Sequence, residues 1–126
     1  MDYNSFKSWL DLYGKAWKTR DPKLIKKLYT KNAKYHEKPF EAPFSGIKSI
    51  TGYWSIIAKT REDVKFDYEI LSVNKKQGIA HWQASFVRKL TQTQVKLDGI
   101  FVVKLNSENK CTVFKEWWQS QKIKLG

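Results

Sequence analysis

The chain has 126 residues, of which 41% are hydrophobic and 15% aromatic, so it can bury one core and leaves little room for a second domain. Cys111 is the only cysteine, which excludes an internal disulfide and a cysteine-rich zinc site. The formal net charge of +12 is compatible with nucleic-acid binding. However, arginine occurs only at Arg20, Arg61 and Arg88, and the lysines are spread along the chain, which favours a solvated coat of surface lysines.

The N-terminus lacks the basic and apolar segments of a secretion signal. The longest obvious apolar run, at 100–103, is far shorter than the roughly 20 residues that a membrane span needs. We therefore expect a soluble, cytoplasmic protein with no membrane partner. A single domain is predicted over residues 1–126, with an ordered core from about residue 2 to about residue 120 and a loose polar tail at 121–126.

Three helices are predicted in the first half of the chain. Apolar residues recur at spacings of three and four from residue 3 to residue 17, which is the stripe of an amphipathic helix that Asp2 can cap. The pair Asp21-Pro22 ends this helix and starts a short second one, with apolar residues at 24, 25, 28 and 29. A third helix begins after Gly46 and carries its apolar stripe at 47, 50, 54 and 57.

Strands are predicted around and after the third helix. A short strand at 33–38 precedes that helix, and Pro39 and Pro43 bracket the loop between them. After Asp63 the hydrophobic period changes to two, which predicts a strand over 64–70 and further strands over 79–90, 94–105 and 111–119. Short polar connections between these strands favour an antiparallel meander that must twist and curl, with the helices covering one face. The fold class is therefore α+β.

Several short segments occur in the order and spacing of a known family: Trp17 with Asp21-Pro22, Leu28-Tyr29, Ala33-Lys34-Tyr35, Pro39-Phe40, Gly46, Ile50 with Tyr53-Trp54, His81-Trp82, Leu97-Asp98-Gly99-Ile100-Phe101 and Phe114-Lys115-Glu116-Trp117-Trp118. Together they resemble the nuclear transport factor 2-like superfamily, and within it the polyketide-cyclase-like (SnoaL-type) bacterial proteins. The resemblance implies a cone-shaped, curved antiparallel sheet wrapped around three N-terminal helices (a cystatin-like half-barrel), a pocket inside the cone and frequent homodimers. It leaves the activity open, because members include isomerases, dehydratases, cyclases, epoxide hydrolases and non-catalytic carriers.

Strand alternation assigns side chains to the two faces of the sheet. In the strand from residue 79, Trp82 and Phe86 share the inner face with two alanines, which would leave room for a cavity. His81 falls on the outer face of the same strand, where a surface or interface role is favoured for it. In the last strand, Cys111 and Trp117 fall on the outer face.

Glu116 and Glu37 are the candidate catalytic carboxylates. Glu116 lies between Phe114 and Trp118 on the expected inner face, and Glu37 shares its face with Tyr35. A carboxylate among aromatic rings loses water, which raises its pKa and suits it to general acid or base catalysis near neutral pH. Tyr35 could donate a hydrogen bond to a developing oxyanion. Alternatively, Glu116 is a structural anchor that only accepts hydrogen bonds from neighbouring side chains.

Asp98 is a further candidate, with a pocket role and a structural role equally open. It precedes Gly99 within a strand, where glycine indicates a bulge that could turn Asp98 inward; without the bulge it faces away from the pocket. His36 and His81 both fall on outer faces, and no cluster with the spacing of metal ligands is present. We therefore expect neither a metal nor another cofactor.

The leading hypothesis is a domain that binds a small apolar or aromatic ligand in an aromatic-lined pocket, with acid–base chemistry of the isomerase, dehydratase or cyclase type as its enzymatic form. One alternative is a non-catalytic homodimeric module that binds a partner through the outer sheet face. The less favoured alternative is nucleic-acid binding through the lysine-rich surface. The predicted pocket residues, which could also be plain core, are Tyr13, Trp17, Tyr35, Glu37, Trp54, Trp82, Phe86, Phe101, Glu116 and Trp118.

Overall fold

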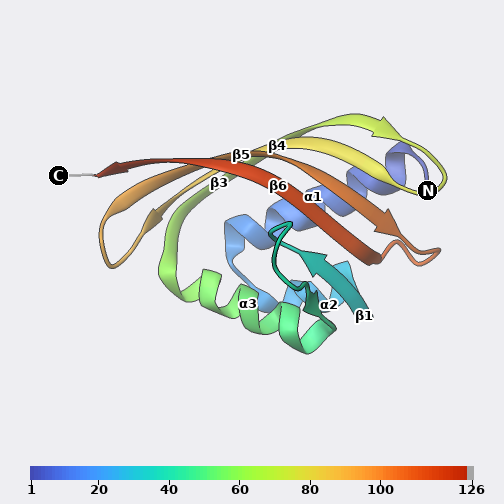
Figure 1. Cartoon of the computed structure of the whole chain (residues 1–126), viewed down its shortest axis with the longest axis horizontal. Coiled ribbons are helices and arrows are strands. Elements are labelled where there is room, and N and C mark those ends of the chain that lie inside the picture. The colour runs from blue at the N-terminus through green and yellow to red at the C-terminus, as the bar shows by residue number, and fades with distance from the viewer. Residues whose placement is uncertain (125–126) are drawn as a thin grey trace.

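The computed structural model describes residues 1–124 and has the α+β architecture expected from the sequence (Figure 1). A curved sheet arches over the helices, which lie together on its concave side (Figure 1). Within the described residues, no helix combines the length and apolarity needed to cross a membrane. The elements in chain order are α1 (Tyr3–Thr19), a short 3-10 helix (Pro22–Leu24), α2 (Ile25–Leu28), β1 (Tyr29–His36), β2 (Phe44–Ser45), α3 (Ile47–Thr60), β3 (Arg61–Val73), β4 (Gly78–Arg88), β5 (Thr93–Leu105) and β6 (Cys111–Lys124).

The helices begin and end where the sequence supplies caps. The Ser5 amide donates to the Asp2 carboxylate at 2.8 Å and the Asp2 amide donates to Ser5 Oγ at 3.0 Å, which closes a capping box at the start of α1. Arg20 adopts a left-handed backbone conformation and ends the helix. Asp21 then caps the 3-10 helix at Pro22–Leu24, so the helix boundary predicted at this pair is confirmed.

The six strands form one mixed sheet in the order β2-β1-β6-β5-β4-β3. The predicted meander is confirmed, because β3 to β6 pair antiparallel in sequence order. The expectation of an entirely antiparallel sheet is wrong at one pair, since β1 runs parallel to β6. Parallel neighbours need a long connection, and here α3 and the strands β3 to β5 lie between the two paired segments.

The last strand is longer than predicted and contains an irregularity near its start. Residues 121–124 pair with Thr93–Lys96 of β5, so the loose tail predicted there is wrong for these residues. Residues 125–126 of that tail lie outside the described residues. Cys111 is fully buried instead of lying on the outer face, because the register shifts between Val113 and Cys111 and reverses the alternation.

The core is a layer of aromatic rings between the helices and the inner face of the sheet. Tyr13 of α1 is fully buried, and its ring centroid lies 5.5 Å from that of Trp54, 5.6 Å from that of Phe66 and 5.2 Å from that of Phe101. These edge-on contacts join α1 to α3 and to two strands. The alternation predicted for β4 is confirmed, since its buried residues include Ala80, Trp82, Ala84 and Phe86.

Gly99 of β5 makes room for two indole rings on the inner face. It pairs with Trp82 of β4 on one side and with Trp118 of β6 on the other. A Cβ at this position would lie 2.9 Å from Trp82 Nε1 and 2.9 Å from Trp118 Cβ, and would meet the carbonyl oxygen of Trp117. Strand pairing is continuous through Gly99, so the bulge expected here is wrong and Asp98 faces away from the helices.

The substitution Gly99→Ala should therefore destabilise the fold by about 1–3 kcal/mol, the usual cost of forcing extra volume into a packed site. Gly52→Ala is the matched control, because a Cβ on this residue of α3 meets nothing within 4 Å. Alanine there should leave the stability unchanged or raise it by about 0.5–1 kcal/mol. Urea unfolding of the three proteins checks this; equal stability for Gly99→Ala and the wild type would contradict the packing described above.

Candidate functional site

A cavity of about 220 Å³ lies at the end of the core where α1 ends and β3 begins. This volume is below the roughly 300–1,000 Å³ of sites for drug-sized ligands, so it suits a small molecule. Most of the residues that line the cavity are either aromatic or charged. The aromatic residues are Trp17, Tyr35, Tyr53, Trp82, Phe86 and Trp118, and the charged residues are Glu37, Lys38, Arg61, Arg88, Glu116 and Lys122.

Glu116 is the buried acid of this cavity. Its side chain projects from the inner face of β6, and the residue is only 6% exposed. The hydroxyl of Tyr35, on the adjacent strand β1, donates a hydrogen bond to Glu116 Oε1 at 3.3 Å. Burial raises the pKa of the Glu116 carboxyl well above its usual range, and the charge of Glu37 adds to this, while the Tyr35 hydrogen bond and Arg61 act in the opposite direction. The carboxyl is therefore suited to hold a proton near neutral pH.

A second acid–phenol pair lies beside the first. Tyr53 of α3 donates its hydroxyl to Glu37 Oε1 at 3.0 Å, and both residues line the cavity. The ring of Tyr53 stacks on that of Phe44, with centroids 4.6 Å apart, which holds the phenol in place. Burial raises the pKa of the Tyr53 hydroxyl, and the charge of Glu37 raises it further, so the phenol stays protonated and remains a donor.

Arg61, the first residue of β3, brings a positive charge into the same space. Its guanidinium carbon lies 4.0 Å from the ring centroid of Phe86 and 5.4 Å from that of Trp17, which is cation–π geometry. The side chain of Arg20 donates a hydrogen bond to the backbone carbonyl of Arg61 and ties this strand start to the end of α1. Burial lowers the pKa of Arg61, but a guanidinium remains charged at neutral pH.

The structure brings together most of the residues that the sequence indicated. Tyr13, Trp54 and Phe101 do not line the cavity: they are buried in the aromatic core behind it. Tyr53, Arg61 and Arg88 line it but were missed. Arg88 could have been predicted, because every second residue of β4 faces inward and Arg88 follows Phe86 by two positions. The predicted pocket residues that line the cavity are Trp17, Tyr35, Glu37, Trp82, Phe86, Glu116 and Trp118.

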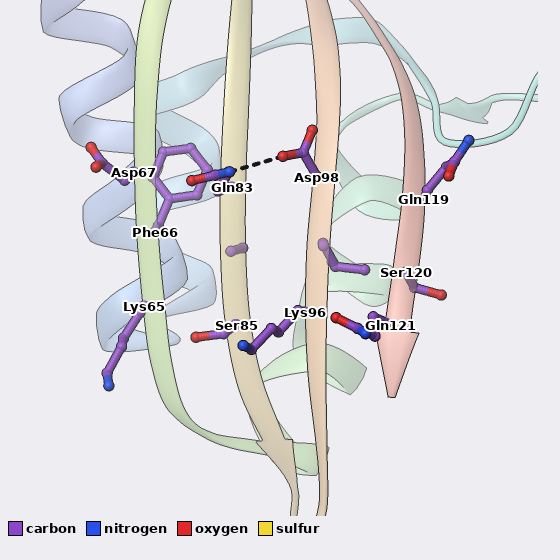
Figure 2. Close-up of a pocket in the computed structure, with 12 residues that line it drawn as sticks. Lys65, Phe66, Asp67, Gln83, Ser85, Lys96, Asp98, Gln119, Ser120 and Gln121 are labelled. Carbon is purple, nitrogen blue, oxygen red and sulfur yellow. Dashed lines mark hydrogen bonds between the residues drawn. The ribbon is translucent and has the colours of Figure 1, made fainter. Parts of the chain in front are cut away.

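Asp98 and His81 lie on the opposite, outer face of the sheet. His81 Nε2 lies 2.9 Å from Asp98 and its Nδ1 lies 3.1 Å from Glu69, and these contacts raise the pKa of His81. Gln83 Nε2 also donates to Asp98, as Figure 2 shows. Asp98 is therefore part of a surface network and does not contribute to the cavity. Within residues 1–124, no group of three or more His, Cys, Asp or Glu side chains is placed to hold a metal ion.

The outer face around Asp98 is hollowed into a trough of about 570 Å³ that crosses the strands of the meander (Figure 2). The polar side chains that line it include Lys65, Asp67, Gln83, Lys96 and Asp98, and Figure 2 shows them on the face away from α1. This trough is larger than the inner cavity, but it holds no buried carboxyl. Acid–base chemistry therefore fits the inner cavity and not the trough.

Comparison with known proteins places the chain by family and fold. The family model of the SnoaL-like domain matches residues 9–113. No curated protein matches the chain. A solved structure of SalBIII, described as an epoxide hydrolase/cyclase-like enzyme in pyran ring formation in the polyether salinomycin, superposes with a TM-score of 0.81 at 18% identity, covering 94% of this chain and 93% of that one.

Two further solved structures share the fold. A hypothetical protein with a ketosteroid isomerase-like fold from Catenulispora acidiphila, in complex with trimethylamine, gives a TM-score of 0.74 at 14% identity and covers 86% of this chain and 83% of that one. An NTF2-like protein of unknown function from Exiguobacterium sp. 255-15 gives 0.73 at 18% identity, covering 88% and 98%. At these identities the likeness extends to the fold and not to the activity.

Proposed function

The chain belongs to the SnoaL-like family, and on this basis we propose that its inner cavity binds a small, largely apolar or aromatic molecule and acts on it by acid–base chemistry of the isomerase, dehydratase or cyclase type. The observation that carries the proposal is the buried Glu116 carboxyl, which meets the Tyr35 hydroxyl at the wall of an aromatic-lined cavity.

The two side chains have complementary roles in such a reaction. Burial raises the pKa of the Glu116 carboxyl, and a raised pKa is what lets a carboxyl serve as a general acid or base at physiological pH. The Tyr35 hydroxyl stays protonated because burial raises its pKa, so it can donate a hydrogen bond to an oxygen that gains negative charge.

The shape of the cavity also limits the ligand. Trp17, Phe86 and Trp118 give it apolar walls, and its small volume excludes extended substrates. Two structural relatives are described as an epoxide hydrolase/cyclase-like enzyme and as a protein with a ketosteroid isomerase-like fold. They support the reaction class without identifying the substrate.

The test is a thermal-shift screen of the purified protein against several hundred small metabolites. A ligand present at about a hundred times its dissociation constant stabilises the fold by about 2.7 kcal/mol, which is a rise of several degrees in Tm. We expect Glu116→Gln to keep the shift and to lose roughly 10²–10⁴-fold in the turnover of that ligand. Glu41→Gln, an exposed carboxylate outside the cavity, is the matched control and should keep both.

Two outcomes would count against the proposal. Turnover at the wild-type rate by Glu116→Gln would remove this residue from the chemistry and leave a binding protein. A screen without hits, on protein shown to be folded, would remove the ligand as well.

A second candidate function is assembly with another copy through the outer sheet face. The trough there carries both signs of charge, with Lys65 and Lys96 close to Asp67 and Asp98 (Figure 2). Such a surface can be complementary to itself across a two-fold axis. Trp117, on the outer face of β6, is 47% exposed and supplies an apolar anchor of the kind that dominates interfaces.

Light scattering at a series of protein concentrations tests this assembly. We expect a dimer that Trp117→Ser weakens by about 2 kcal/mol or more, as loss of an interface tryptophan usually does. Ile56→Ser, which also removes an exposed apolar side chain but lies on α3, should leave the dimer intact. A wild-type protein that is monomeric throughout, or equal effects of the two substitutions, would contradict assembly through this face.

A further inference from the structure

Two arginines face each other at the cavity. Arg61 is the first residue of β3, Arg88 is the last residue of β4, and the two are direct partners in the antiparallel register. Both line the cavity. Placing like charges on paired positions is unfavourable unless something of opposite charge lies near them.

Within the described residues, neither arginine forms an ion pair, although the charge of Glu37 acts on Arg61 from a longer distance. No carboxylate of residues 1–124 lies within the 4.0 Å ion-pair distance of either guanidinium, since the ion pairs found are Lys7–Asp11, His81–Glu69 and His81–Asp98. Lys38 and Lys122 add two further cations to the lining. On the acid side, Glu37 is engaged by the Tyr53 hydroxyl and Glu116 by the Tyr35 hydroxyl. The cavity therefore has a surplus of positive charge.

The position of Arg61 is also defined. Its guanidinium carbon lies 4.0 Å from the ring centroid of Phe86, and the residue is only partly exposed. This cation–π contact does not consume N–H donors, and the side chain of Arg61 makes no hydrogen bond to residues 1–124, so its N–H donors are free for a ligand. Those donors can make a bidentate contact with a planar anion.

We propose that the ligand of this cavity is a small organic carboxylate, whose anionic group binds between Arg61 and Arg88 while its apolar body lies against the aromatic wall and its reacting end reaches Glu116 and Tyr35. This inference rests on the proposed function, since it names the substrate class of the same cavity. It accounts for two arginines at paired positions of an otherwise largely aromatic cavity without a carboxylate in ion-pair contact.

The surroundings favour a carboxylate over a phosphate. Phosphate groups are usually bound at the N-terminus of a helix, where amide N–H groups point at the ligand. Here α3 ends at Thr60 and presents its C-terminus, with its partial negative charge, next to Arg61. A dianion is penalised more than a monoanion in that position, whereas the aromatic wall suits the body of an organic acid.

The experiment compares 3-phenylpropanoate with 3-phenylpropanamide, which has nearly the same shape and no charge, and includes inorganic phosphate as a third probe. Binding is followed by calorimetry and by amide chemical shifts of the folded protein. We expect the acid to bind the wild type at least tenfold more tightly than the amide. Arg88→Gln, at an exposed position that should not affect folding, should reduce this preference about tenfold, a loss of about 1.4 kcal/mol. Arg61→Gln should do the same.

Lys26→Gln is the matched control, because it removes one positive charge from an exposed position of α2 outside the cavity. It should leave the preference unchanged. Equal affinity for acid and amide would overturn the anion site while leaving the proposed ligand cavity in place. Binding of phosphate but not of the acid would assign the arginines to a different ligand and overturn the carboxylate. Binding of none of the probes by the folded protein would count against both the inference and the proposed function.

Discussion

The packing of aromatic rings against the inner face of the curved sheet determines the rest of this structure. Tyr13 of α1 contacts rings from α3 and from two strands, and on the sheet the rings of Trp82 and Phe101 stack 4.8 Å apart and nearly parallel. Rigid, wide side chains fill most of the concave side and hold the helices there. At the end of α1 they line a space instead of filling it, and Gly99 lets Trp82 and Trp118 pack closely over the sheet.

This packing has an electrostatic consequence for the polar groups that share the cavity. Glu116 lies among rings that exclude water, so its charged form is penalised and its hydroxyl neighbour Tyr35 becomes its main partner. Arg61 remains charged and lies over an aromatic face, which compensates part of its lost hydration. One cavity thus contains an acid whose pKa is raised by burial and a cation held over an aromatic ring, the combination that an acid–base reaction on a charged small molecule would use.

The sequence predicts the elements and the inner faces well, because both follow from local periodicity. Alternation placed Trp82, Phe86 and Glu116 inside correctly, since each lies in an uninterrupted stretch of strand pairing. It failed for Cys111, where a register shift that depends on the partner strand reverses the faces. The parallel pairing of β1 with β6 and the meeting of Arg61 with Arg88 are long-range contacts that periodicity does not contain. The cavity acid and the inward position of Arg88 were therefore predictable, while the meeting of Arg88 with Arg61 was not.

Burial in the cavity raises the pKa of the Glu116 carboxyl well above that of an exposed glutamate. The most direct measurement is a pH titration of the side-chain carboxyl carbons of all glutamates by carbon-13 NMR, with Glu116→Gln used to assign the resonance. The side-chain carboxyl of an unperturbed glutamate titrates at about pH 4.3, and an exposed glutamate of this protein should titrate in the same range. We expect the Glu116 resonance to change only at distinctly higher pH. Its titration midpoint should rise further when Tyr35 is replaced by Phe, because the Tyr35 hydrogen bond lowers this pKa. A Glu116 resonance that titrates in the ordinary acid range, with the same midpoint in the wild type and in Tyr35→Phe, would contradict a raised pKa for Glu116.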